Sequence, residues 1–174
     1  MVINHSYCKY KGKIYNCTVE TEKTILRSFD DSDYIIRCFR LNPSYSENPL
    51  TSACKYFKRV PTSDIDWFCL VITVGYYKDC KVYVKSETKN EYRIDIFNIS
   101  NTKSKEYKVF TEENGFEKSD RYDWYGNVPK SEVENIVQIV TTAGRSLKAP
   151  DKWDFQIPGD DNEFPRKVVS YDDV

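Results

Sequence analysis

The feature that most constrains the fold of this chain is an internal repeat at an offset of 68 residues. The segment VPTSDID at 60–66 is echoed by VPKSEVE at 128–134, and the agreement continues from 71–73 to 139–141. The sixteen-residue window contains four identities, whereas ordinary composition gives about one by chance. A repeat of this length indicates two copies of one small structural unit.

Three further blocks align at the same offset. They pair 13–15 with 81–83, Phe29 with Phe97, and 56–57 with 124–125. Because independent blocks share one offset, we interpret residues 7–75 as a first β unit and residues 76–146 as a second. Residues 147–174 then form an acidic tail that contains three prolines.

Each unit is predicted to consist of short strands, because β-branched and aromatic residues gather in short runs between polar turns. The expected strands are 13–19, 24–29, 34–41, 55–60 and a run through 71–74, then 81–85, 91–97, 106–111, 123–128 and 136–141. The last segment has an alternative, because 132–139 also fits two helical turns. The prediction is a mainly β chain, with an α+β chain carrying a helix after each Val-Pro-x-Ser motif as the alternative.

Each unit resembles a Src-homology-3-like small barrel. The resemblance rests on four strands, a Val-Pro-x-Ser turn and a final strand within about 68 residues. In such barrels a one-turn 3₁₀ helix precedes the last strand. The resemblance implies two tandem small barrels followed by an extended C-terminal tail. The aromatic groove and acidic loop of the proline-binding members have no match here, so it does not imply binding of a proline-rich peptide.

The charge pattern argues against a nucleic-acid or membrane-surface binder. The chain has 26 basic and 27 acidic residues, a net charge of −1, and so lacks a field of a single sign. Residues 149–174 hold three basic and seven acidic residues, which leaves a net charge near +3 on 1–148. No segment approaches the roughly 18 apolar residues of a membrane span, and the first residues lack a signal sequence. We therefore expect a cytoplasmic protein with no membrane partner.

The sequence predicts no enzyme activity, cofactor or metal site. His5 is the only histidine, the six cysteines include no Cys-x-x-Cys pair, and the six glycines are scattered. Asp30, Asp31 and Asp33 resemble the start of a calcium loop, but the required glycine and distal glutamate are missing. Their expected role is to form a solvated turn.

The aromatic content points to protein binding. The chain has fourteen tyrosines and three tryptophans, and exposed aromatic residues are enriched at protein interfaces. The densest cluster comprises Tyr122, Asp123, Trp124 and Tyr125. We predict that this cluster and the loop of Asp30, Asp31 and Asp33 contact a partner, although Trp124 fits the core equally well.

The opening Tyr-Lys-Gly-Lys-x-Tyr at 10–15 and the repeated Val-Pro motif are similar to two-unit bacterial proteins of the immunity type. This resemblance implies an inhibitor without chemistry of its own that binds and blocks a toxin domain. An adaptor in a larger complex is one alternative. A nucleic-acid-binding tandem barrel is another, in which the basic and aromatic residues of 9–13 and 55–59 would share one face. In-and-out alternation along a strand explains those residues more simply, and the oligomeric state stays open.

Overall fold

The structure of the chain is a computed structural model. It describes residues 4–43, 45, 54–97, 99, 101, 103–141, 148–150 and 164–169. The strands of this part form one open sheet in the order β4-β5-β3-β2-β1-β6-β7-β8-β10-β9, and β11 and β12 extend the sheet from the other edge of β6. The pairings are antiparallel except that of β11 with β12. The prediction of a mainly β chain is confirmed.

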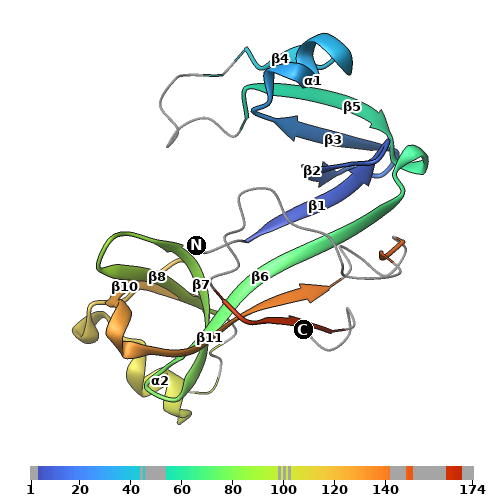
Figure 1. Cartoon of the computed structure of the whole chain (residues 1–174). Helices are drawn as coiled ribbons and strands as arrows, with labels where there is room; N and C mark the ends of the chain where they lie inside the picture. Colours follow the sequence, from blue (N-terminus) through green and yellow to red (C-terminus); the bar gives the residue numbers. More distant parts are fainter. Residues whose placement is uncertain are drawn as a thin grey trace.

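After the first strand of the chain, the strands and α-helices of the first half recur in the same order in the second half, which also contains the 3₁₀ helix η2 and the final strand β12 (Figure 1). In the first half they are β1 (His5–Tyr10), β2 (Lys13–Val19), β3 (Lys23–Ser28), α1 (Asp31–Ile36), β4 (Arg40–Leu41), β5 (Tyr56–Pro61), the 3₁₀ helix η1 (Thr62–Asp64) and β6 (Trp67–Tyr77). The second half continues with β7 (Cys80–Glu87), β8 (Glu91–Ile96), α2 (Lys105–Val109), η2 (Glu112–Asn114), β9 (Glu117–Lys118), β10 (Trp124–Pro129), η3 (Lys130–Glu132), β11 (Val133–Thr141) and β12 (Arg166–Val168).

The strand registers repeat with the offset found in the sequence. Tyr56 pairs with Ser28 in the first half, and Trp124 pairs with Ile96 in the second. β7 has a bulge between Val84 and Ser86, and before this bulge the offset between equivalent residues is 67. Tyr10 pairs with Lys13 across the β1–β2 turn, and Tyr77 pairs with Cys80 across the β6–β7 turn. The predicted match of 13–15 with 81–83 is therefore one residue out of register. The extra residue of a bulge explains the difference.

Two predicted strands are helices. The segment 34–41 was expected to be one strand, but its first residues end α1 and only Arg40–Leu41 forms a strand. The segment 106–111 was expected to be a strand and instead lies in and just after α2. Side-chain caps start both helices, since Asp30 accepts a hydrogen bond from the Ser32 amide and Ser104 accepts one from the Tyr107 amide.

The Val-Pro motifs end two strands and begin a single 3₁₀ turn. Thr62–Asp64 and Lys130–Glu132 form the two turns, after which β6 and β11 begin. The alternative prediction of a longer helix after each motif is wrong. The run after the first motif forms β6, which pairs with β1, and the run after the second motif forms β11, which pairs with β6. β6 continues unbroken past residue 75, where the first unit was expected to end. The exact unit boundaries stay an interpretation.

Each half has its own core, and a third cluster lies between them. The first core includes Tyr15, Leu26 and Phe39, and the second includes Ile94, Phe110 and Phe116. The third lies on the opposite face of β1 and β6, where Tyr7, Trp67, Cys69, Val71 and Val140 pack together. Figure 1 shows the two halves as separate lobes joined along β6. We call them the first and the second unit.

Part of the tail is ordered against the second unit. β12 adds to the free edge of β11, and Phe164 packs against the second core. Trp153, Phe155 and Ile157 of the tail lie outside the described residues.

Candidate functional site

Large exposed apolar side chains lie on α1 and on the segments that flank it in the first unit. Ile35 and Ile36 are 78% and 75% exposed, and they occupy the last turn of α1. Phe29 precedes this helix, Tyr34 lies within it, and Leu41 lies on β4 beyond it. We call these five residues the α1 patch. They make up five of the nine large hydrophobic side chains that are exposed in the described residues.

Helix α1 is fixed to the sheet by Asp33, which is fully buried. Its carboxylate accepts hydrogen bonds from Lys13 Nζ at 2.8 Å, Tyr15 Oη at 3.0 Å and Ser28 Oγ at 2.5 Å. Arg37, one turn further along, forms an ion pair with Asp33 at 3.4 Å. These bonds satisfy a buried charge, which would otherwise be very unfavourable.

The other two predicted aspartates fix the base of the helix. Asp30 caps the helix and binds Lys13 Nζ at 2.6 Å, while Asp31 binds Lys55 Nζ at 2.5 Å and Tyr56 Oη at 2.6 Å. The hydrogen bond from Lys13 lowers the pKa of Asp30, and that from Lys55 lowers the pKa of Asp31. Both groups are therefore ionised at neutral pH and paired with bases.

Tyr34 links the patch to the sheet. Its ring stacks on that of Tyr56, with 5.4 Å between ring centroids. Leu41 pairs with Tyr56 across β4 and β5 and so lies on the same side of the sheet. The exposed side chains thus lie on a short helix that several side-chain bonds hold in one position.

The structure separates the residues of the second predicted cluster. Trp124 is buried in the second core, while Tyr125 lies on the opposite face of β10. Tyr125 donates a hydrogen bond to Glu117 at 2.5 Å, and the Arg93 guanidinium lies 4.4 Å from the centroid of its ring. Tyr122 is 38% exposed, and Asp123 is half-buried. Strand alternation places Trp124 and Tyr125 on opposite faces of β10, while Tyr122 and Asp123 precede this strand.

Of the predicted aspartates, Asp33 lies in the interior, while Asp30 and Asp31 are exposed beside the α1 patch. Sequence reasoning identified this segment but missed the apolar residues next to it. Phe29 and residues 34–36 were expected to lie in strands, and this expectation did not predict that their side chains would be exposed. A capped turn starting at Asp30 was the signal that could have revealed them.

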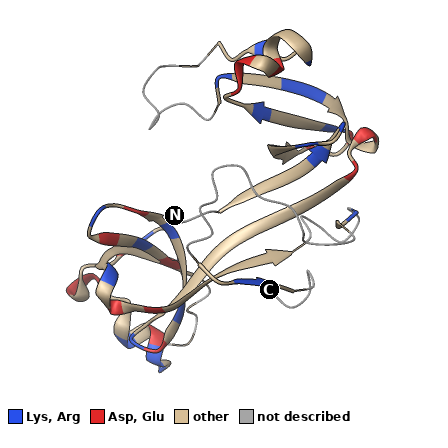
Figure 2. Cartoon of the chain, in the orientation of Figure 1, with Lys and Arg blue, Asp and Glu red and all other residues tan. Residues whose placement is uncertain are grey.

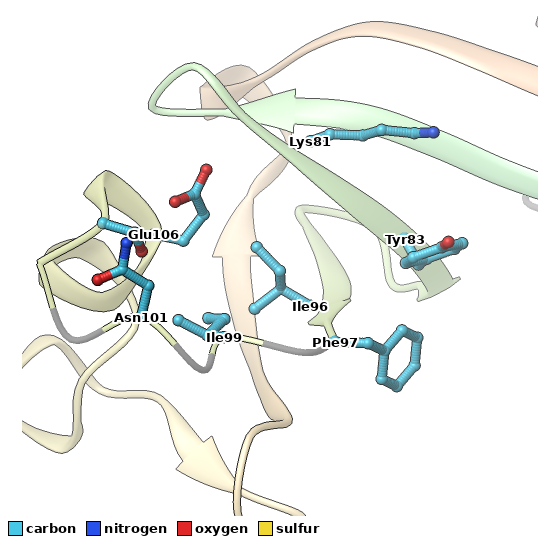
Figure 3. A pocket seen from close by; sticks show the side chains of 8 residues that line it. Lys81, Tyr83, Ile96, Phe97, Ile99, Asn101 and Glu106 are labelled. Carbon is cyan, nitrogen blue, oxygen red and sulfur yellow. The ribbon is translucent and has the colours of Figure 1, made fainter.

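A hollow of about 350 Å³ lies in the second unit between the end of β8 and α2 (Figure 3). Lys81 extends away from Glu106 in this view, so the two charges do not converge on one point. The aromatic rings of Tyr83 and Phe97 lie 5.2 Å apart at its rim. Ser104 and Glu106 both line the hollow, and the backbone hydrogen bond of Glu106 and then the hydrogen bond from the Ser104 side chain lower the pKa of the Glu106 carboxylate. The residues around it are Lys81, Tyr83, Ile96, Phe97, Ile99, Asn101, Ser104 and Glu106.

His5, the only histidine of the chain, lies on β1. Burial and the positive charge of Arg27 lower its pKa. The six cysteines are free thiols, and all except Cys38 are buried. Within the described ranges, no three His, Cys, Asp or Glu side chains gather as a metal site would require. No helix there is long and apolar enough to cross a membrane.

Comparison with known proteins gives one match. Searches of curated proteins and of solved structures found none. A family model matches residues 2–143, which include the first unit and nearly all of the second and exclude the tail at 147–174. The chain therefore belongs to the family described as Uncharacterised conserved protein UCP033725.

Proposed function

We propose that this chain is a non-enzymatic protein-binding module and that the α1 patch is its contact surface. The observation that carries the proposal is the exposure of five large apolar side chains on one short helix and its flanks. Contiguous exposed apolar surface marks interaction sites, because water disfavours it in a free monomer.

The surroundings of the patch match the anatomy of an interface. Protein interfaces have an apolar centre and a polar rim. Here the rim consists of Asp30, Asp31 and Lys55. The Asp33 bonds hold the helix in place before binding, so little conformational entropy is lost when the partner docks.

The form of this function that we propose is an immunity-type inhibitor that acts in the cytoplasm by occupying a toxin domain. It follows from the sequence resemblance. We also interpret each unit as a diverged Src-homology-3-like small barrel. The strand order β6-β1-β2-β3-β5, with η1 between β5 and β6, supports that interpretation. Partner contact by Asp30, Asp31 and Tyr122 stays a prediction.

The test is affinity capture from the native host, followed by titration calorimetry with the purified partner. The double variant Ile35→Ser/Ile36→Ser should weaken binding by about thirty-fold or more, because the loss of even one residue central to an interface costs about 2 kcal/mol or more. Its thermal melt should match that of the unaltered protein, because both side chains already face water.

The matched control is Phe97→Ser in the second unit, which is 38% exposed and remote from α1. This variant should bind the partner normally. If the two isoleucines can be replaced without loss of affinity, the α1 patch is not the contact surface. If the captured partner is an enzyme whose activity the bound chain leaves unchanged, the inhibitor form of the proposal is wrong.

A further inference from the structure

The outer face of the first unit carries a row of arginines around an aromatic ring. Arg40 on β4 and Arg27 on β3 both pair with Phe57 on β5. Arg59, two residues along β5, lies on the same face and is exposed. Tyr56 and Val60 of the same strand point to the core, so this face is the opposite side of the sheet from the α1 patch.

The three arginines have no carboxylate partner among the residues described by the structure. Arg27 makes one long hydrogen bond, to Asn16 Oδ1 at 3.5 Å, and the Arg59 guanidinium lies 5.6 Å from the centroid of the Phe57 ring. Figure 2 shows basic segments on β3 and β5, whereas the acidic segments of this lobe lie at α1 and at the turn before β6. Within the part of the chain that the structure describes, no carboxylate therefore pairs with the positive charges of this face.

The equivalent face of the second unit is neutralised. There Glu117, Tyr125 and Asp95 occupy the positions of Arg40, Phe57 and Arg27. Glu117 accepts the hydrogen bond of the Tyr125 hydroxyl, and Asp95 lies 4.0 Å from Lys85 and 3.9 Å from Arg93. Since the same fold is built with paired charges in one unit, the unpaired arginines of the other are not needed for folding.

Two hollows adjoin the ring of Phe57. They measure about 360 and 280 Å³, and Phe57 and Arg59 line both of them. Arg40 lines the first, and Arg27 lines the second. The half-buried ring is thus accessible from two sides, with a guanidinium group near each.

We propose that this face binds single-stranded nucleic acid, as a second function beside the proposed protein contact. The guanidinium groups of Arg27, Arg40 and Arg59 would contact successive phosphates, and a base would stack on Phe57. Adjacent strands lie about 4.8 Å apart, so Arg27 and Arg40 are separated by about 10 Å across the sheet. An extended backbone can follow such a row.

The chemistry of the face favours this ligand over the other anionic macromolecules. A duplex keeps its bases stacked inside, so it would leave the Phe57 ring unused. An acidic protein needs an apolar interface centre, and the large exposed apolar side chains of this unit lie on the α1 side instead. A flexible single strand can place its phosphates on the arginines and one of its bases on the Phe57 ring.

The experiment measures the fluorescence anisotropy of a labelled single-stranded oligonucleotide of about 12 nucleotides, which lies within the usual site sizes. The full chain is titrated at salt concentrations from about 50 to 200 mM. Arg27→Gln, Arg40→Gln and Arg59→Gln together should reduce the slope of log K against log salt by about 2, since each phosphate contact on a single strand contributes about 0.7.

A matched control removes three charges from the second unit by Lys81→Gln, Lys103→Gln and Lys108→Gln, all of which are exposed. This variant should keep the affinity and the slope of the unaltered protein. Equal weakening by the two triple variants would show non-specific attraction and overturn the proposal. Absence of binding at the lowest salt concentration would also overturn it.

The role of the ring is tested by Phe57→Leu, which retains apolar volume and removes the aromatic face. Binding of the oligonucleotide should weaken at least about fivefold, because stacking of one base is worth about that factor or more. If Phe57→Leu has no effect and polyglutamate competes as well as unlabelled oligonucleotide, the face is a site for acidic proteins and the proposal fails. Ile35→Ser/Ile36→Ser should leave this binding unchanged, which separates it from the protein contact.

Discussion

Among the described residues, Asp33 is the one charged side chain that is wholly buried. Its partners Lys13, Tyr15 and Ser28 come from β2 and β3, so α1 is bound to two strands of the first unit. Burial and then the hydrogen bond to Asp33 raise the pKa of Tyr15, which keeps this hydroxyl protonated as a donor. The second unit has Cys80, Val82 and Ile96 at the equivalent positions. The network is thus a feature of one unit only.

We predict that Asp33→Asn lowers the free energy of unfolding by about 3 kcal/mol, because it leaves Lys13 and Arg37 beside a neutral buried group. Urea unfolding followed by tyrosine fluorescence measures the change. Asp31→Asn is the control, since the pair of Asp31 with Lys55 is exposed to solvent, which screens it, and should contribute little to stability. Equal effects of the two substitutions would contradict the structural role of Asp33.

At this scale the sequence predicted residue types better than their surroundings. Asp30, Asp31 and Asp33 were singled out because they cluster, but their spacing alone could not tell a solvated turn from a capped helix. The difference depends on side chains of the neighbouring strands. Lys13 and Tyr15 are 17 to 20 residues away in the sequence, and Ser28 is 5 residues from Asp33. Trp124 was predicted to belong to the contact cluster, with the core as the alternative, and the structure places it in the second core.

At the scale of elements, the strands that pair locally were predictable. β2 was placed at 13–19, where the structure has it, and β3, β5, β7 and β10 were placed to within a few residues. The two helices were missed, because Tyr34, Ile35 and Ile36 favour strands by propensity. The bonds of Asp33 outweigh that propensity, and the sequence pattern contains no sign of them.

Gly126 on β10 permits a close approach that the equivalent strand of the first unit does not make. A Cβ at this position would lie 2.7 Å from Cδ1 and 3.0 Å from Cε1 of Phe116. Phe116 cannot move away freely, because its ring packs 4.7 Å from that of Phe110 and 5.9 Å from that of Tyr77, between centroids. The Phe116 ring can therefore pack this closely against β10 because Gly126 has no Cβ.

Gly126→Ala should destabilise the protein by about 1 to 3 kcal/mol through overpacking. Urea unfolding measures this change in the free energy of unfolding. The cost should be smaller in a Phe116→Leu background, because the shorter side chain leaves room for the new methyl group. If the two substitutions are strictly additive, the Gly126 and Phe116 contact is not the cause of the destabilisation.

At the scale of the whole molecule, the repeat was visible in the sequence, but the continuity of the sheet was not. Similar residues at a fixed offset reveal two related units and carry no information on how the units meet. In the structure β6 belongs to both, since β1 pairs with residues 67–71, β7 pairs with 74–77, and β11 runs along the other edge. These pairings join residues far apart in the chain, which local patterns do not predict.

The gap between β1 and β7 on that shared edge is filled by one side chain. Asn4 Oδ1 accepts a hydrogen bond from the Thr73 amide at 2.8 Å, and Asn4 Nδ2 donates to the carbonyls of Val84 at 2.7 Å and Lys85 at 3.1 Å. On this edge of β6, the pairing with β1 ends at Val71 and the pairing with β7 begins at Val74, and the Asn4 carboxamide supplies hydrogen bonds between the two. It connects the start of the first unit to the first hairpin of the second.

Asn4→Ala should lower the free energy of unfolding by about 2 kcal/mol, because three hydrogen bonds are lost and water replaces them only in part. The Thr73 amide should exchange with solvent faster than its neighbours in β6, since Asn4 is its acceptor. Hydrogen exchange followed by mass spectrometry, together with urea unfolding, measures both effects. Asn127→Ala on the exposed side of β10 is the control and should change the stability by less than about 0.5 kcal/mol. Unchanged exchange of Thr73 in Asn4→Ala would mean that the two units are held together by β6 and β11 alone.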